Sequence, residues 1–109
     1  MTLQKAFVRF NSNSRIDILN VRKETSKIID FKRCNGVYDS EYSVRFFNNS
    51  AKTKEYTHEL ICLVNEDKDT LKVPIKPSVI KLPVGVRYYE VWDTTRSVLV
   101  FFGNLEILK

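Results

Sequence analysis

Hydrophobic side chains alternate with polar ones in segment after segment of this chain, a period of two that is typical of β-strands with one buried face. The helical period of about 3.6 does not persist over any useful length. Turn-forming residues interrupt the alternation about every 8–12 residues, the spacing of a sandwich or barrel. The pattern predicts strands over residues 6–10, 16–18, 29–31, 42–46, 56–64, 71–75, 86–92 and 98–107.

Several positions break the alternation and carry expectations of their own. The apolar positions change parity near Leu19, which predicts a bulge or the end of pairing. Pro74 and Pro77 lack the N–H that a ladder needs, so their strand must lie at an edge or end there. Gly103 allows a bulge in the last strand. Residues 78–82 are expected to form a single turn of helix.

Polar runs mark where the chain turns. Asn35-Gly36 is a strong turn signal because both residues tolerate positive φ, so the chain is expected to reverse there. Residues 65–69 form a charged hairpin tip that resembles a calcium loop only in its oxygen ligands, since the central Gly and the final Glu are missing. Residues 93–96 are expected to form another hairpin loop.

Parity along each strand predicts which side chains are buried. The segment 56–64 becomes apolar on both faces, so its far end is expected to be the deeper one. On the strand 86–92, Tyr88, Glu90 and Trp92 share one face, and Tyr89 shares the other with Val91. Aromatic residues there can fill a core or anchor an interface. The predicted core consists of Val44, Phe46, Leu60, Cys62, Val91, Val100 and Leu105.

Length and composition fit one packed domain over residues 1–109, with 7 Phe, 5 Tyr and 1 Trp to fill its core. The net charge of +5 comes from interspersed charges of both signs, without a basic run or a zinc-ligand spacing. A nucleic-acid partner is therefore not expected. No stretch approaches the roughly 18 consecutive apolar residues of a membrane span, so no membrane partner is expected either.

The inventory of reactive side chains is small. His58 is the single histidine, and Cys34 and Cys62 lie far apart without a Cys-x-x-Cys partner. The two cysteines are read as buried thiols, with a disulfide between them left open. Nothing nominates a nucleophile with a base, a phosphate loop or a metal ligand set. We therefore expect no catalytic site, no cofactor and no metal.

The last part of the chain carries a family resemblance. Its residues are Leu71-Lys72-Val73-Pro74-Ile75, then Leu82-Pro83-Val84-Gly85 leading into Val86-Arg87-Tyr88-Tyr89-Glu90-Val91-Trp92-Asp93, then Phe101-Phe102-Gly103-Asn104-Leu105-Glu106-Ile107. This stretch resembles the closing part of small immunoglobulin-like β-sandwich proteins of tailed bacteriophages, including N-terminal domains of baseplate upper proteins. The resemblance implies an all-β, immunoglobulin-like antiparallel sandwich of about eight strands.

The same resemblance implies a non-catalytic structural component of a bacteriophage virion, in the tail, baseplate or fibre-attachment region or as a capsid decoration. Its partners would be other virion structural proteins, with multiple copies in a symmetric assembly. The protein would be in the host cytoplasm before assembly and in the virion afterwards. The alternative is a free-standing cytosolic β-sandwich that binds or inhibits a host protein.

A protein-binding role needs a surface, and Arg and Tyr are favoured where an interface is both apolar and hydrogen-bonded. The edge opposite the Pro74–Pro77 region is expected to be the better docking edge, because prolines curtail pairing on their own side. The residues predicted to contact a partner are Arg87, Tyr88, Tyr89, Arg96 and Phe101.

Overall fold

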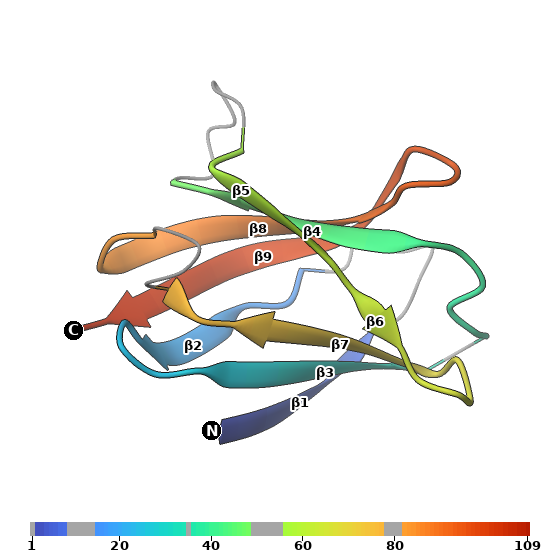
Figure 1. The fold of residues 1–109 in the computed structure, drawn as a ribbon, viewed down its shortest axis with the longest axis horizontal. Helices are drawn as coiled ribbons and strands as arrows, with labels where there is room; N and C mark the ends of the chain where they lie inside the picture. The colour runs from blue at the N-terminus through green and yellow to red at the C-terminus, as the bar shows by residue number, and fades with distance from the viewer. Residues whose placement is uncertain (1, 9–14, 35, 49–55, 78–81) are drawn as a thin grey trace.

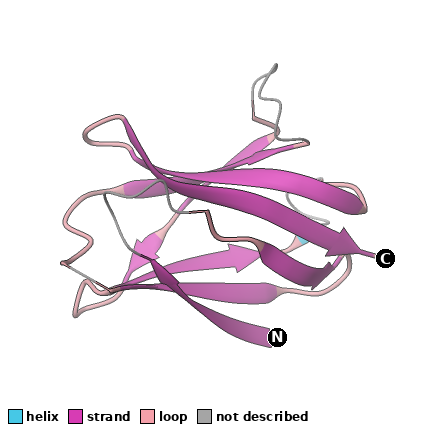
Figure 2. Ribbon diagram, turned by 180° about the vertical axis from the view of Figure 1, so that it is seen from behind, coloured by secondary structure: helices cyan, strands magenta, loops and turns pink. Residues whose placement is uncertain are grey.

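The alternating segments form β-strands in the computed structural model of the chain, which describes residues 2–8, 15–34, 36–48, 56–77 and 82–109. Two sheets pack face to face (Figure 1, Figure 2). More than half of the described residues lie in strands, so the prediction of an all-β sandwich is confirmed. The strands within these ranges are β1 (Thr2–Val8), β2 (Ile18–Arg22), β3 (Lys27–Arg33), β4 (Tyr42–Phe47), β5 (His58–Ile61), β6 (Leu63–Val64), β7 (Thr70–Ile75), β8 (Gly85–Asp93) and β9 (Val98–Leu108).

The strand order is that of an immunoglobulin-type sandwich, with a difference in direction. One sheet has the order β1-β3-β7-β6 and the other the order β2-β9-β8-β4-β5. The first sheet and the strands β9-β8-β4-β5 of the second match the A-B-E-D and G-F-C-C′ orders of that fold, and β2 is an additional strand beside β9. The expectation of an entirely antiparallel sandwich is wrong, because β1 runs parallel to β3 and β2 runs parallel to β9. The cause is β2, which returns along the opposite sheet before β3 repeats the direction of β1.

The strand predicted over residues 56–64 is divided between the two sheets. β5 pairs with β4, and β6 pairs with β7 in the other sheet. Cys62 lies at the crossing, where its side chain is buried and its N–H donates to the Tyr42 carbonyl at 2.9 Å. The far end of the segment is the deeper one, as expected, because Cys62 is buried and Leu60 and Val64 pack against the core. It is not covered on both faces, since Ile61 and Leu63 point away from the core. The division accounts for nine strands in the described residues instead of about eight.

The core lies between the inner faces of the two sheets. The Phe31 ring, on β3, lies 4.8 Å from the Phe101 ring and 6.1 Å from the Tyr89 ring of the opposite sheet, measured between centroids. The predicted parity of β8 is confirmed, because Tyr89 and Val91 join the core while their neighbours face outward. The predicted core is largely confirmed: Val44, Phe46, Cys62, Val91 and Leu105 are buried, and Leu60 and Val100 are partly buried against them.

The two predicted bulges have different outcomes. The bulge near Leu19 is confirmed by a register shift between Ile18 and Val21. β9 has its shift opposite Val91 and Trp92, not at Gly103. Gly103 has another role, because a Cβ at this position would lie 1.9 Å from the Ile16 carbonyl oxygen. Only glycine lets the segment before β2 approach β9 this closely.

Prolines and turns behave largely as their chemistry requires. β7 ends at Ile75, and Pro74 lies beyond the residues of β7 that β6 pairs with, so its missing N–H costs no ladder bond. Asn65 closes the tip before β7: its side-chain oxygen accepts from the N–H groups of Asp69 and Thr70, each at 3.1 Å. Asn35 and the predicted helical turn, apart from Leu82, lie outside the described residues. The chain passes from β3 to β4 in the opposite sheet.

We expect Gly103→Ala to destabilise the protein by roughly 1–3 kcal/mol, because the added methyl group displaces the Ile16 carbonyl from β9. Urea unfolding of both proteins measures the difference. Asn104→Ala, at the next residue, is the control and should cost about 0.5 kcal/mol or less, because its side chain is only partly buried. Equal stability of Gly103→Ala and the wild type would contradict the close approach.

Candidate functional site

The five residues predicted to contact a partner do not form one exposed surface. Tyr89 and Phe101 are 1% exposed in the core, and the Tyr89 hydroxyl donates to the Ile16 carbonyl. Tyr88 faces outward from β8 but is buried between the rings of Phe47 at 5.6 Å and Phe102 at 6.1 Å. These three aromatic side chains hold the sandwich together, so the composition that suggested an interface serves packing.

Arg87 fastens the turn that leads into β8. Its guanidinium donates to the carbonyls of Pro83, Val84 and Asn48 at 3.0, 2.6 and 3.2 Å. The turn needs Gly85, whose φ is +129° and whose added Cβ would lie 2.9 Å from the Arg87 guanidinium. Arg87 therefore positions the backbone of this turn.

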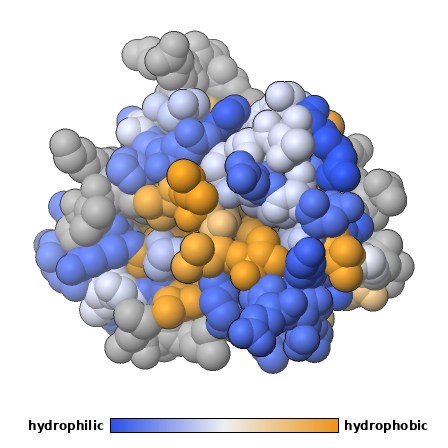
Figure 3. Space-filling view, turned by 45° about the vertical axis from the view of Figure 1, so that its right-hand side comes forward, coloured by the Kyte–Doolittle hydropathy of each residue, from blue (hydrophilic) through white to orange (hydrophobic). Residues whose placement is uncertain are grey.

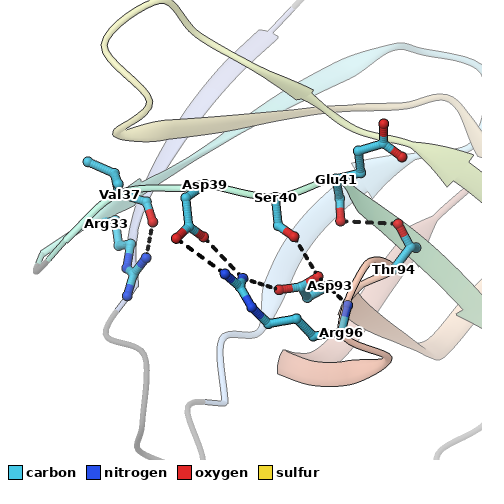
Figure 4. Close-up of polar contacts among 8 residues, drawn as sticks. All are labelled: Arg33, Val37, Asp39, Ser40, Glu41, Asp93, Thr94 and Arg96. Atoms are coloured by element: carbon cyan, nitrogen blue, oxygen red, sulfur yellow. Dashed lines mark hydrogen bonds and ion pairs between the residues drawn. The ribbon is translucent and has the colours of Figure 1, made fainter.

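Arg96 joins the β8–β9 hairpin to the segment that precedes β4 (Figure 4). Its Nη1 donates to Asp39 Oδ1 at 3.2 Å and to Asp93 Oδ2 at 2.8 Å. Asp93 also accepts from the Ser40 hydroxyl at 2.8 Å and from the Arg96 N–H at 3.0 Å. The Thr94 N–H donates to the Glu41 carbonyl at 2.9 Å. Side chains and backbone together tie this end of the sandwich.

The electrostatics of this end follow from those contacts. Hydrogen bonds and charge from Arg96 lower the pKa of Asp39. Burial acts to raise the pKa of Asp93, but the hydrogen bonds from Arg96 and Ser40 outweigh it, so that pKa is also lowered. Both carboxylates are ionised at neutral pH and face a cation within the chain. The arrangement lacks an acid or base poised near neutrality, and it acts as a structural clasp.

A second polar group lies on the outward face of the five-stranded sheet. The Arg45 guanidinium lies 5.1 Å from the Tyr56 ring centroid and 4.9 Å from that of Trp92, and its Nε donates to Glu59 Oε2 at 2.8 Å. The hydrogen bond from Arg45 lowers the pKa of Glu59. Beside it, Glu90 accepts from the Trp92 indole at 3.0 Å. The rings and carboxylates orient Arg45 across the sheet.

The remaining reactive side chains do not converge. Cys34 is exposed and Cys62 is buried, and both are free thiols, so the disulfide that the sequence left open is not formed. Burial raises the pKa of the Cys62 thiol to about 12, which keeps it protonated. The described ranges hold no group of three or more His, Cys, Asp or Glu side chains arranged to bind a metal ion. They also hold no helix of sufficient length and hydrophobicity to cross a membrane.

The most exposed large hydrophobic side chains lie where the chain crosses between the sheets. Ile61 is 83% exposed and Leu63 is 68% exposed, on the edge strands β5 and β6. Figure 3 brings the side of β6 forward and shows hydrophobic side chains gathered across the middle of this face (Figure 3). Isolated surface leucines are ordinary, but two aliphatic side chains two residues apart on unpaired strand edges are typical of a protein-binding surface. We call residues 58–64 the crossing edge.

The amino-acid composition does not identify the crossing edge, but an unbroken apolar run in the sequence does indicate it. Residues 60–64 are apolar at every position, and a strand in a two-layer sandwich has one core face. Such a run is either covered on both faces or partly exposed, and the structure shows exposure.

Comparison with known proteins adds no relative: no protein-family model matches the chain, and a search of the curated proteins finds no match.

Acid should weaken the clasp, because the pKa of Asp93 is lower in the folded protein than in the unfolded chain. The ionised carboxylate stabilises the fold at pH values above the unfolded-state pKa, and this contribution is lost as the pH falls through the folded-state pKa. We expect Asp93→Asn to cost roughly 1–3 kcal/mol at neutral pH and to reduce the loss of stability below about pH 3.8, the ordinary Asp value. Urea unfolding at a series of pH values measures both effects. The exposed Glu24→Gln is the control, and equal acid sensitivity of Asp93→Asn and the wild type would refute the clasp.

Proposed function

We propose that this protein is a non-catalytic structural component of a bacteriophage virion that acts by binding other virion proteins. The observation that carries the binding role is the crossing edge, with Ile61 and Leu63 exposed on strands that have no outer neighbour among the described residues. An unpaired edge offers backbone hydrogen bonds, and aliphatic side chains beside it add apolar area to any strand that docks.

The assignment to a virion is supported by the resemblance of residues 71–107 to small sandwich proteins of tailed phages. In this chain that stretch forms β7, β8 and β9, including the Pro83–Gly85 turn that Arg87 fastens. The two sheets give a module that Arg96 ties at the β8–β9 hairpin and that presents strand edges among its described residues. Such a module suits the tail, the baseplate, fibre attachment or capsid decoration, where repeated contacts between copies hold the assembly.

The test is the composition of purified particles. Particles from cells that produce the protein are isolated on a density gradient, and mass spectrometry measures its copy number against the major capsid protein. We expect a fixed copy number related to the particle's symmetry. Wild-type protein found only in the free cytosol, bound to a host enzyme, would overturn the virion assignment in favour of a cytosolic inhibitor.

A variant pair tests the crossing edge in the same particles. Ile61→Ser combined with Leu63→Ser should lower the copy number of the protein per particle by about tenfold or more, because the apolar contact is lost. The matched control is Val86→Ser combined with Val98→Ser, at valines that are 59% and 51% exposed elsewhere on the surface. Equal incorporation of the two double variants would show that the crossing edge is not the docking site.

A further inference from the structure

The sandwich has four sheet edges in the described residues, and two of them are blocked. β6 contains only two residues, and beyond it β7 presents Pro74, which has no N–H. β2 is bulged, and side chains already bond its backbone: Lys27 Nζ donates to the Leu19 carbonyl at 2.9 Å. The other two edges, β1 and β5, are regular in register with their neighbours. Strand addition is therefore open at β1 and β5.

The alternation of backbone groups identifies the residues that face a new strand. On β5, the N–H of Cys62 donates to Tyr42, so the amides of Glu59 and Ile61 turn to the free side. On β1, the carbonyl of Val8 accepts from Cys34 N at 2.7 Å, so the odd-numbered residues Lys5 and Phe7 turn outward. On each edge, two residues that lie two positions apart therefore turn their backbone groups to the free side.

The side chains of these four residues are complementary. Glu59 uses Oε2 to accept from Ser43 and Arg45, and its Oε1 accepts no hydrogen bond from any described residue. Lys5 is exposed and has no ion pair with a residue that the structure describes. Beside them Ile61 is 83% exposed and Phe7 is 64% exposed. One edge therefore presents an acid with an aliphatic group, and the other presents a base with an aromatic ring.

We propose that β5 of one copy of this protein pairs antiparallel with β1 of a second copy, which makes the second copy the occupant of the free edge. This inference rests on the proposed function and names one partner of the crossing edge. Antiparallel pairing lets outward residues of both strands face each other, with Glu59 opposite Phe7 and Ile61 opposite Lys5. Lys5 then reaches Glu59 Oε1 on the diagonal, and the ring of Phe7 reaches Ile61.

The contact is heterologous, because each copy uses β1 on one side and β5 on the other. Such contacts do not stop at a dimer; they close into a ring or continue as a chain, according to the rotation between copies. Pairing also extends the five-stranded sheet of one copy into the four-stranded sheet of the next. Added salt weakens the association, because the Lys5–Glu59 attraction is exposed and screened.

Analytical ultracentrifugation over a concentration series tests the pairing on the whole chain. We expect the average mass to rise past that of a dimer. Lys5→Glu places like charges together, and Ile61→Pro removes an outward N–H, a change that an edge strand tolerates. Each variant alone should weaken self-association by about tenfold or more. Val86→Lys, away from both edges, is the control, and circular dichroism checks the fold of each protein.

Mixing the two variants gives the decisive result. The Lys5→Glu copy keeps β5 intact and the Ile61→Pro copy keeps β1 intact, so the mixture should form a one-to-one complex and nothing larger. If Ile61→Pro does not fold, Ile61→Ser replaces it. A mass that stops at a dimer, a mixture without a complex, or a monomer at every concentration would overturn the proposal. The proposed function would survive any of these results if particles still require Ile61 and Leu63.

Discussion

At Cys62 the chain leaves the five-stranded sheet and enters the four-stranded one, and the character of the surface follows from this crossing. Successive side chains of an extended chain point in opposite directions, so burying Cys62 requires that Ile61 and Leu63 point outward. The chain passes from one sheet to the other with the Cys62 side chain buried at the crossing, and the exposure of Ile61 and Leu63 is the geometric consequence. Hydrophobic residues at those two positions contribute nothing to the core, which is why a partner is the better explanation for them.

Three arginines of the sandwich are engaged within the chain. Arg96 holds two aspartates, Arg87 holds the carbonyls of a turn, and Arg45 lies between two rings with Glu59 beside it. These contacts fix the hairpin at one end and the turn into β8, and they orient the outward face of the larger sheet. These three guanidinium groups therefore serve the fold, and the proposed binding role is assigned to the strand edges instead.

The periodicity of the sequence was sufficient to predict the fold class, because an alternation of two reflects one buried face regardless of which sheet a strand joins. The end of the strand near Pro74 was predictable from local chemistry too, since a residue without an N–H cannot donate to a neighbouring strand in any sheet. Sheet membership was not predictable: nothing in residues 56–64 marks the crossing except an excess of apolar positions. Parity also could not show that Phe47 and Phe102 cover Tyr88 on the outward face, which is why an expected contact residue is buried.

The two open edges belong to different sheets, and that difference gives the module a direction. β1 ends the four-stranded sheet and β5 ends the five-stranded sheet, so a strand added at one edge leaves the other unoccupied. A contact between like edges would pair two copies and stop, whereas a contact between unlike edges lets every copy keep the same orientation around a symmetry axis. A strand from an unrelated neighbour can end the series at either edge. Under the proposed pairing, one small sandwich would bind its own copies and still attach to a different protein.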